Sequence, residues 1–215
     1  NCRCYWNIYT VNRCSTFSAS NKSWHHCHII FASFHKINNS YKSNRFLDFE
    51  LYLAQSPLRS DAQALLIEKA TELGVTGVYP VMTDNCAVNK SVAEKKVAKW
   101  QKIMYEASKQ CERASIPECY EVSTIEKVIS ENHFDKIIVF CERIADKTIR
   151  DCFIEKQIQQ NEKVLVIIGP EGGFTDQEYK KIVDLGFESI SLGKRILRAE
   201  TAAIYLSSII VGKCQ

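Results

Sequence analysis

The chain of 215 residues contains only eight glycines and four prolines, and its first 46 residues contain no Asp, Glu, Gly, Pro, Leu, Gln or Met. Of Gly, Pro, Asn and Asp, which form many tight turns, only asparagine occurs there. The same segment carries six basic side chains and no acid, whereas the rest of the chain holds 22 basic and 25 acidic ones. A basic segment beside a mildly acidic body favours contact with phosphate, and an unusual composition without function is the alternative.

The sequence also lacks an apolar stretch long enough to span a membrane, and it shows no secretory leader. We therefore expect a protein of the reducing cytoplasm, without a membrane partner, whose ten cysteines are free thiols. Cys2, Cys4, Cys14 and Cys27 lie near three histidines, but they lack the paired C-x2-C spacing of a zinc site. No metal is expected. The other six cysteines are predicted to be small buried hydrophobic residues.

Strand-like and helix-like segments alternate from Phe49 onward, which predicts an α/β fold with a parallel sheet. One helix is expected to be capped by Asp61 and stopped by Gly74, and a longer one to run from Ala93 to Glu112 with one apolar stripe. The other expected elements are strands at 49–53, 76–82, 119–122, 136–141 and 164–168, a helix capped by Ser123, and a helix between Asp146 and Gln157.

The strand expected at 164–168 ends in the glycine-rich run Gly169-Pro170-Glu171-Gly172-Gly173-Phe174. The strand is apolar throughout, as in strands buried on both faces, and open α/β sheets bind ligands at such carboxyl ends. Thr175 and Glu178 have the spacing of a capping box that starts a helix. The loop lacks the spacing of a Walker phosphate loop and of a dinucleotide fingerprint. It predicts a nucleotide pocket of another kind, and a tight turn without a ligand is the alternative.

A second run, Leu192-Gly193-Lys194-Arg195-Ile196-Leu197-Arg198-Ala199-Glu200-Thr201-Ala202, follows the next strand end. Together the two runs resemble the SPOUT superfamily of S-adenosylmethionine-dependent RNA methyltransferases. The resemblance is closest to the RsmE family, which methylates N3 of uridine in 16S ribosomal RNA. It extends from about Leu53 to the C-terminus, with further matching segments at 68–75, 106–113 and 116–118. The segment 58–62 departs from the K-G-D-[RK] stretch that is usual in the family.

The resemblance implies an architecture. Residues 49–215 are expected to form a SPOUT-type parallel sheet with a deep trefoil knot at the C-terminal end, and to assemble as a homodimer with the cofactor site near the interface. Residues 1–48 are expected to hold a small β module similar to the RNA-binding PUA fold, and their composition predicts that this module is truncated. The apolar segment 201–211 is expected to be a dimer or core element.

The resemblance also implies where S-adenosylmethionine binds. We expect it to contact Phe140, for which closing the sheet edge is the alternative role, and residues of both runs. The expected contacts in the runs are Ile168, Gly169, Pro170, Glu171, Gly172, Gly173, Leu192, Gly193, Ile196, Leu197, Thr201 and Ala202.

Three residues form the expected catalytic set. Arg198 would stabilise the uracil anion that forms when N3 loses its proton, and an ion pair with Glu171 or Glu200 is its alternative role. Glu171 and Arg113 complete the set. A carboxylate of ordinary pKa is a poor acceptor for an imide proton, so the sequence does not identify the general base.

Ribosomal RNA of the small subunit is the expected partner, contacted by Lys69, Gln110 and Arg113, for which simple solvation is the alternative role. The run of Lys95, Lys96 and Lys99 is typical of a solvated helix face. Two other functions remain open. One is methylation of another RNA position, including a ribose 2′-hydroxyl. The other is RNA binding without catalysis, which the unusual first 46 residues favour.

Overall fold

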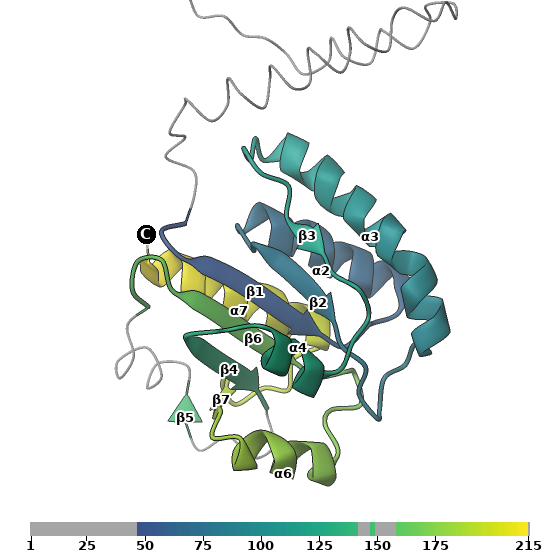
Figure 1. Cartoon of the computed structure of the whole chain (residues 1–215), viewed down its shortest axis with the longest axis vertical. Coiled ribbons are helices and arrows are strands. Elements are labelled where there is room, and N and C mark those ends of the chain that lie inside the picture. Colours follow the sequence, from purple (N-terminus) through teal and green to yellow (C-terminus); the bar gives the residue numbers. More distant parts are fainter. Residues whose placement is uncertain (1–46, 142–146, 149–157, 215) are drawn as a thin grey trace, which may run out of the picture. The chain divides into compact units, whose positions relative to one another are not determined.

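The computed structural model describes residues 47–141, 147–148 and 158–214, which lie in a compact unit formed by residues 46–215 (Figure 1). The described residues form one sheet of parallel strands in the order β3-β2-β1-β6-β4-β7-β5. The predicted α/β fold with a parallel sheet is confirmed. The strands are β1 Glu50–Gln55, β2 Gly77–Pro80, β3 Glu118–Cys119, β4 Lys136–Phe140, β5 Lys147–Thr148, β6 Lys163–Ile168 and β7 Glu188–Ser191.

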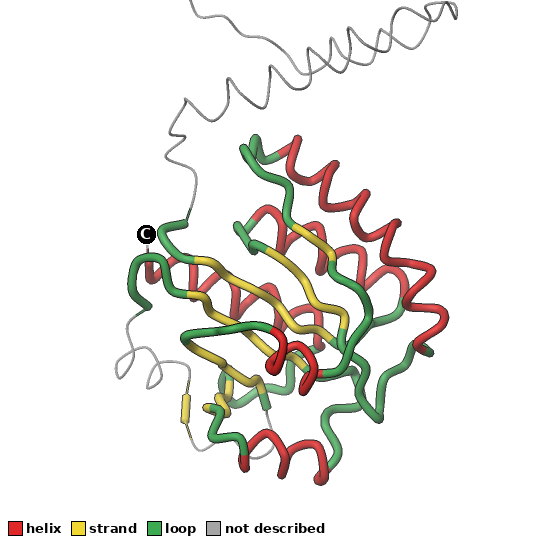
Figure 2. Tube along the Cα trace, viewed as in Figure 1, coloured by secondary structure: helices red, strands yellow, loops and turns green. Residues whose placement is uncertain are grey.

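Helices cover both faces of this sheet, as parallel sheets require. The long helices α2, α3 and α7 pack on one face, and the shorter α4 and α6 pack on the other (Figure 2). None of the described helices is long and apolar enough to cross a membrane. The helices are α2 Ser60–Glu72, α3 Lys90–Gln110, α4 Ile125–Glu131, α6 Asp176–Asp184 and α7 Ala199–Cys214.

The two central strands supply apolar side chains to both layers of the core. On β1, Leu51 and Leu53 point into the core under α2, α3 and α7, whereas Tyr52 and Ala54 point toward α4 and α6. The residues 164–168 of β6 are all at most 1% exposed. Alternate side chains of a strand point to opposite faces, so a strand buried on both faces must be apolar at every position.

Helix α3 has the amphipathic pattern that its sequence predicts. Ala93, Trp100, Met104 and Ala107 are buried and recur at intervals of three, four and seven residues. The helix starts three residues earlier than expected, because Asn89 takes the extended N-cap conformation. One stripe of α3 thus belongs to the core, and its opposite face is left to solvent.

Two predicted helix caps are wrong. Helix α2 begins at Ser60, so Asp61 lies inside its first turn and Arg59 takes the N-cap position without a side-chain cap. Helix α4 is capped by Thr124, whose hydroxyl accepts a hydrogen bond from the Lys127 N–H. Ser123 cannot cap this helix because its backbone bridges to β2, accepting from Met82 N–H and donating to the Pro80 carbonyl. The left-handed conformation expected at Gly74 is confirmed, with φ +97°.

Two further elements differ from expectation. The strand expected at 119–122 is the two-residue β3, Glu118–Cys119, and the ring of Tyr120, which follows it, stacks on Tyr79. The helix expected between Asp146 and Gln157 is wrong at residues 147–148, which form β5 at the sheet edge. The rest of that segment lies outside the described residues, as do the clustered cysteines and histidines of the first 28 residues.

An aromatic cluster closes the face of the sheet near α4. The Tyr79 and Tyr120 rings stack with centroids 4.0 Å apart, and Tyr52 and Phe134 pack beside them. Burial raises the pKa of the Tyr79 hydroxyl above its usual range. Gly77 leaves room for this cluster, because a Cβ atom there would lie 2.7 Å from Tyr120 Cε2.

Replacement of this glycine should therefore destabilise the fold. We expect Gly77→Ala to lower the free energy of unfolding by about 1–3 kcal/mol, since the stacked ring must move. The matched control is Gly212→Ala, in the exposed part of α7, where a Cβ meets no atom within 4 Å. That change should raise stability by about 0.5–1 kcal/mol. Urea denaturation of both variants measures the two effects, and equal stabilities would contradict the crowding at Gly77.

Candidate functional site

Three strand ends align at one edge of the sheet. Gln55 of β1 and Phe140 of β4 both pair in register with Ile168 of β6. The loops that follow these strands therefore leave the sheet side by side. In an open α/β sheet, this edge is where ligands bind.

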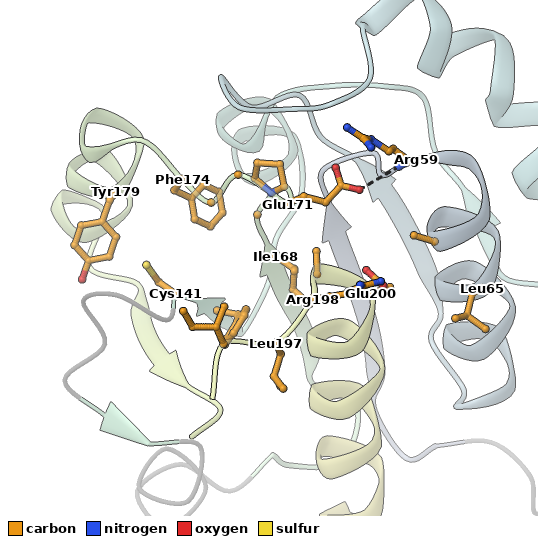
Figure 3. Close-up of a pocket in the computed structure, with 18 of the residues that line it drawn as sticks. Arg59, Leu65, Cys141, Ile168, Glu171, Phe174, Tyr179, Leu197, Arg198 and Glu200 are labelled. Atoms are coloured by element: carbon orange, nitrogen blue, oxygen red, sulfur yellow. Dashed lines mark hydrogen bonds between the residues drawn. The ribbon is translucent and has the colours of Figure 1, made fainter. Parts of the chain in front are cut away.

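A cavity of about 920 Å³ lies at this edge (Figure 3). Its walls come from the loop after β1 with the start of α2, the end of β4, the glycine-rich loop with the start of α6, and the segment 196–200 before and in α7. The volume lies within the range of small-molecule sites. The cavity is thus built by segments that are far apart in the sequence.

Most of the expected cofactor contacts line this cavity. They are Phe140, Ile168, Gly169, Pro170, Glu171, Gly172, Gly173, Ile196 and Leu197, and the expected catalytic Arg198 joins them. Four other expected contacts are not among the lining residues. Leu192 packs against the core, Gly193 turns the chain after β7 with φ +126°, Thr201 is exposed on α7, and Ala202 is fully buried.

The three expected RNA contacts lie away from the cavity. Lys69 forms ion pairs with Glu68 and Glu72 on α2, with Nζ–Oε1 distances of 2.7 and 2.9 Å. Gln110 is exposed at the end of α3. Arg113 donates through Nη1 to the carbonyls of Thr71 and Val75, at 2.8 and 2.9 Å. Arg113 therefore ties the end of α2 to the segment after α3.

The cavity also contains residues that the sequence did not single out as site residues. Arg59, Asp61, Ala62 and Leu65 come from the loop after β1 and the start of α2. The sequence could have identified these four residues. It predicts the strand β1, and the residues that follow the carboxyl end of such a strand lie at the edge where ligands bind. Phe174, Asp176, Tyr179 and Ala199 are further unexpected lining residues, and Cys141 and Glu200 line the cavity as well.

The glycine-rich loop is a tight structure in which two glycines leave little space for a side chain. A Cβ atom at Gly169 would lie 3.0 Å from the Phe174 ring, and one at Gly172 would lie 3.0 Å from Asn85 Cβ. Gly173 has φ +73° and donates its N–H to the Pro170 carbonyl at 2.9 Å. A side chain at Gly172 would thus push against the loop after β2. The backbone of this loop closes on itself and leaves its other side to the cavity.

A buried amide holds the start of this loop. The Gln55 side chain is fully buried, and its Nε2 donates to the carbonyls of Ser56 and Gly169, at 2.9 and 3.2 Å. Its Oε1 has no hydrogen-bond partner among the described residues. Burial of an unpaired carbonyl costs free energy. The amide nevertheless links the ends of β1 and β6 directly under the cavity wall.

The loop after β2 holds the other end of the glycine-rich loop. Asn85 Nδ2 donates to the Gly173 carbonyl at 3.1 Å, and Asp84 N–H donates to Glu178 Oε1 at 2.9 Å. The Thr175 hydroxyl lies 3.2 Å from Asp84 Oδ2. Thr175 and Glu178 form the reciprocal capping box of α6, which confirms the predicted helix start. These contacts fix the entry of the chain into α6.

Negative charge dominates the ionisable lining of the cavity. Four carboxylates and two guanidinium groups line it, from Asp61, Glu171, Asp176, Glu200, Arg59 and Arg198. Figure 3 shows the Arg59 N–H directed at Glu171 Oε1, at 3.5 Å, across the mouth of the cavity. An excess of carboxylates favours a ligand that carries positive charge.

Comparison with known proteins identifies the class. The family model described as "RNA methyltransferase domain" matches residues 46–211. A solved structure of ribosomal RNA small subunit methyltransferase E from Neisseria gonorrhoeae, bound to S-adenosyl methionine, is similar with a TM-score of 0.68 and 28% identity. The similarity covers 79% of this chain and 69% of that one.

Two curated relatives carry the same name. Ribosomal RNA small subunit methyltransferase E of Bacillus subtilis is 31% identical over 78% of this chain and 67% of its own length. The protein of that name from Mesomycoplasma hyopneumoniae is 33% identical over 77% of this chain and 70% of its own length. The chain therefore belongs to the family of ribosomal RNA small subunit methyltransferase E, as its motifs predicted.

The capping box gives a prediction for the site. Thr175→Ala removes the hydroxyl that accepts from Glu178 N–H and that contacts Asp84. We expect a loss of about 1 kcal/mol in the free energy of unfolding, the usual cost of removing an N-cap hydroxyl. Thr175→Ser keeps the hydroxyl and should retain most of the stability. Urea denaturation of both variants tests this, and equal losses would assign the effect to the methyl group of Thr175 instead.

Proposed function

We propose that this protein transfers a methyl group from S-adenosylmethionine to N3 of a uridine in 16S ribosomal RNA of the small subunit. The observation that carries the proposal is the cavity at the aligned ends of β1, β6 and β4, closed by the glycine-rich loop, in a chain of this family. The N3 position follows from the resemblance of the sequence motifs.

The residues of the cavity suit S-adenosylmethionine. This cofactor supplies a methyl group that is bonded to a positively charged sulfur, and the surplus of carboxylates in the lining complements that charge. The buried side chains of Phe140 and Ile168 provide an apolar base for a purine ring. At Gly173, no atom lies within 4 Å of the position that a Cβ would take, so backbone can approach a ligand there.

Arg198 is the residue that we assign to charge stabilisation. Neutral uracil has a proton on N3 and no free lone pair there, so the proton must leave before the nitrogen can form a bond to carbon. The uracil ring then carries negative charge on its carbonyl oxygens. A guanidinium group in the cavity wall stabilises that charge in the manner of an oxyanion site. Arg198 lies at the entry to α7 and lines the cavity (Figure 3).

The proposal extends to the assembly of the protein. One face of α7 is buried through Ala203, Leu206 and Ile210, whereas Tyr205 on another face is 44% exposed. We assign that outer face to a homodimer, and the C-terminal segment to a trefoil knot. The knot is supported by the chain path, because α7 follows the outlying β7 but packs against α2 and β6.

The proposal also covers the domains and the location of the protein. Residues 1–48 are assigned to a truncated PUA-like module and residues 49–215 to the methyltransferase domain. The protein is assigned to the cytoplasm.

The identity of the product tests the proposed function. The purified protein should methylate small-subunit ribosomal RNA that lacks the modification, when S-adenosylmethionine is supplied. Mass spectrometry of the digested RNA should show N3-methyluridine. A 2′-O-methylated nucleoside would instead support methylation at a ribose. Binding of S-adenosylmethionine without methylation of naked RNA or of assembled subunits would support RNA binding without catalysis.

A substitution at Arg198 separates catalysis from binding. If the guanidinium acts on charge that appears only during the reaction, Arg198→Ala should lower single-turnover methylation about 10²-fold or more. The affinity for S-adenosylhomocysteine, measured by calorimetry, should change little. If Arg198 is instead a structural ion-pair partner, cofactor affinity and melting temperature should fall together. Normal turnover in the variant would remove Arg198 from the mechanism.

A further inference from the structure

The acidic lining of the cavity does not suit the phosphate backbone of RNA, so another surface must bind it. RNA binding depends largely on contacts between basic side chains and phosphates. The cavity offers two guanidinium groups beside four carboxylates, which favours a cation and a neutral base over a polyanion. Residues 47–215 as a whole carry 22 basic and 25 acidic side chains. A surface for phosphates must therefore be a local concentration of positive charge.

Helix α3 is such a concentration. It carries six lysines and two glutamates in 21 residues. Lys95, Lys99 and Lys102 are exposed and are spaced by four and three residues, so they lie on one side of the helix. At 3.6 residues per turn, this side is opposite the stripe of Ala93, Trp100 and Met104 that is buried in the core. We call Lys95, Lys99 and Lys102 the α3 basic face.

The lysines of the α3 basic face are not neutralised by neighbours. None of the three forms an ion pair with a residue in the described part of the chain. The two glutamates of α3 pair with other lysines, Glu94 with Lys90 and Glu106 with Lys109. Glu106 lies on the same side of the helix, one turn beyond Lys102, but its carboxylate pairs with Lys109. The positive charge of the three lysines is therefore available to an anionic partner.

The basic face lies on the helix that borders the mouth of the cavity. Lys96, one turn from Lys99, donates to the Ser60 hydroxyl at 3.3 Å. Ser60 follows Arg59, which lines the cavity. From there α3 extends away from the ligand edge along the outside of the sheet (Figure 1). The α3 basic face spans about 10 Å along the helix axis, from Lys95 to Lys102, at 1.5 Å per residue.

We infer that the α3 basic face binds the phosphate backbone of the substrate RNA while the target base enters the cavity. This inference rests on the proposed function. The charge of the face complements the RNA backbone, and each of its three exposed lysines can neutralise a phosphate. The cavity and the α3 basic face therefore bind different parts of the substrate. The acidic cavity receives the cofactor and the uncharged base, and the basic helix receives the phosphates.

The test uses the full chain and a transcript of small-subunit ribosomal RNA. In the test variant Lys95, Lys99 and Lys102 are all replaced by Gln, which keeps helix propensity and removes three charges. Each phosphate contact lowers the slope of log affinity against log salt by about 0.7–0.9. The slope of the variant should therefore be shallower by about 2–3. Between 50 and 200 mM salt, its affinity should fall about 20–40-fold less than that of the wild type.

The matched control replaces Lys127, Lys163 and Lys181 by Gln, which removes the same charge from lysines that have carboxylate partners elsewhere on the domain. Its salt slope should stay close to the wild-type value. A second variant, with Arg at positions 95, 99 and 102, should bind like the wild type. Under multiple-turnover conditions the Gln variant should show a raised KM for RNA, with kcat and S-adenosylhomocysteine affinity unchanged.

Two results would separate the inference from the function on which it rests. If the wild type methylates the RNA and the α3 Gln variant has the same salt slope and KM, the α3 basic face is not an RNA surface. Equal losses in the α3 Gln variant and the control would also overturn it, because they would indicate a general effect of net charge. If the wild type methylates no RNA, the proposed function itself fails.

Discussion

The burial of β6 between β1 and β4 is the constraint on which the site depends. All five residues 164–168 are withdrawn from solvent on both faces, so the strand cannot shift in register without exposing apolar side chains. Its carboxyl end is thereby held level with the ends of its neighbours. The Gln55 amide extends this constraint by one residue beyond the sheet, because it holds the Gly169 carbonyl. The glycine-rich loop begins from a fixed point.

The loop is held at its far end by a different set of contacts. Asn85 and Asp84, which follow β2, contact the segment that leads into α6. Loops after β1 and β2 therefore both support the backbone after β6. Two of the glycines lie in close contact with neighbouring side chains. A Cβ atom at Gly169 would press on the Phe174 ring, and one at Gly172 would press on Asn85 in the supporting loop after β2.

The sequence allowed the sheet and much of the site to be predicted, because these depend on local patterns. The continuous apolar run at 164–168 indicated a doubly buried strand, and the capping box at Thr175 indicated the start of α6. The caps predicted at Asp61 and Ser123 are wrong, and at Ser123 the reason is a tertiary contact. Ser123 is held by the backbone of β2, which leaves Thr124 to cap α4.

The positions of the arginine side chains in the fold could not be predicted from the sequence motifs alone. Arg113 and Arg198 both lie in segments that match the family, and both belong to the expected catalytic set. In the fold, Arg113 donates to the carbonyls of Thr71 and Val75, and burial lowers the pKa of its guanidinium from the usual value. Arg198 lines the cavity instead, as does Arg59, which lies in a segment that departs from the family pattern.

The three arginines differ in position because one follows the end of a helix and the other two precede the start of one. Arg113 follows the C-terminus of α3, far along the helix from the ligand edge, whereas Arg59 and Arg198 immediately precede α2 and α7. In a parallel α/β sheet, helices that follow strands begin at the carboxyl edge and run away from it. Arg59 and Arg198, at the starts of helices that follow the central part of the sheet, are therefore placed at the cavity. Arg113, which follows the end of α3, is carried to the opposite edge, where it can stabilise the fold but cannot reach the reacting atoms.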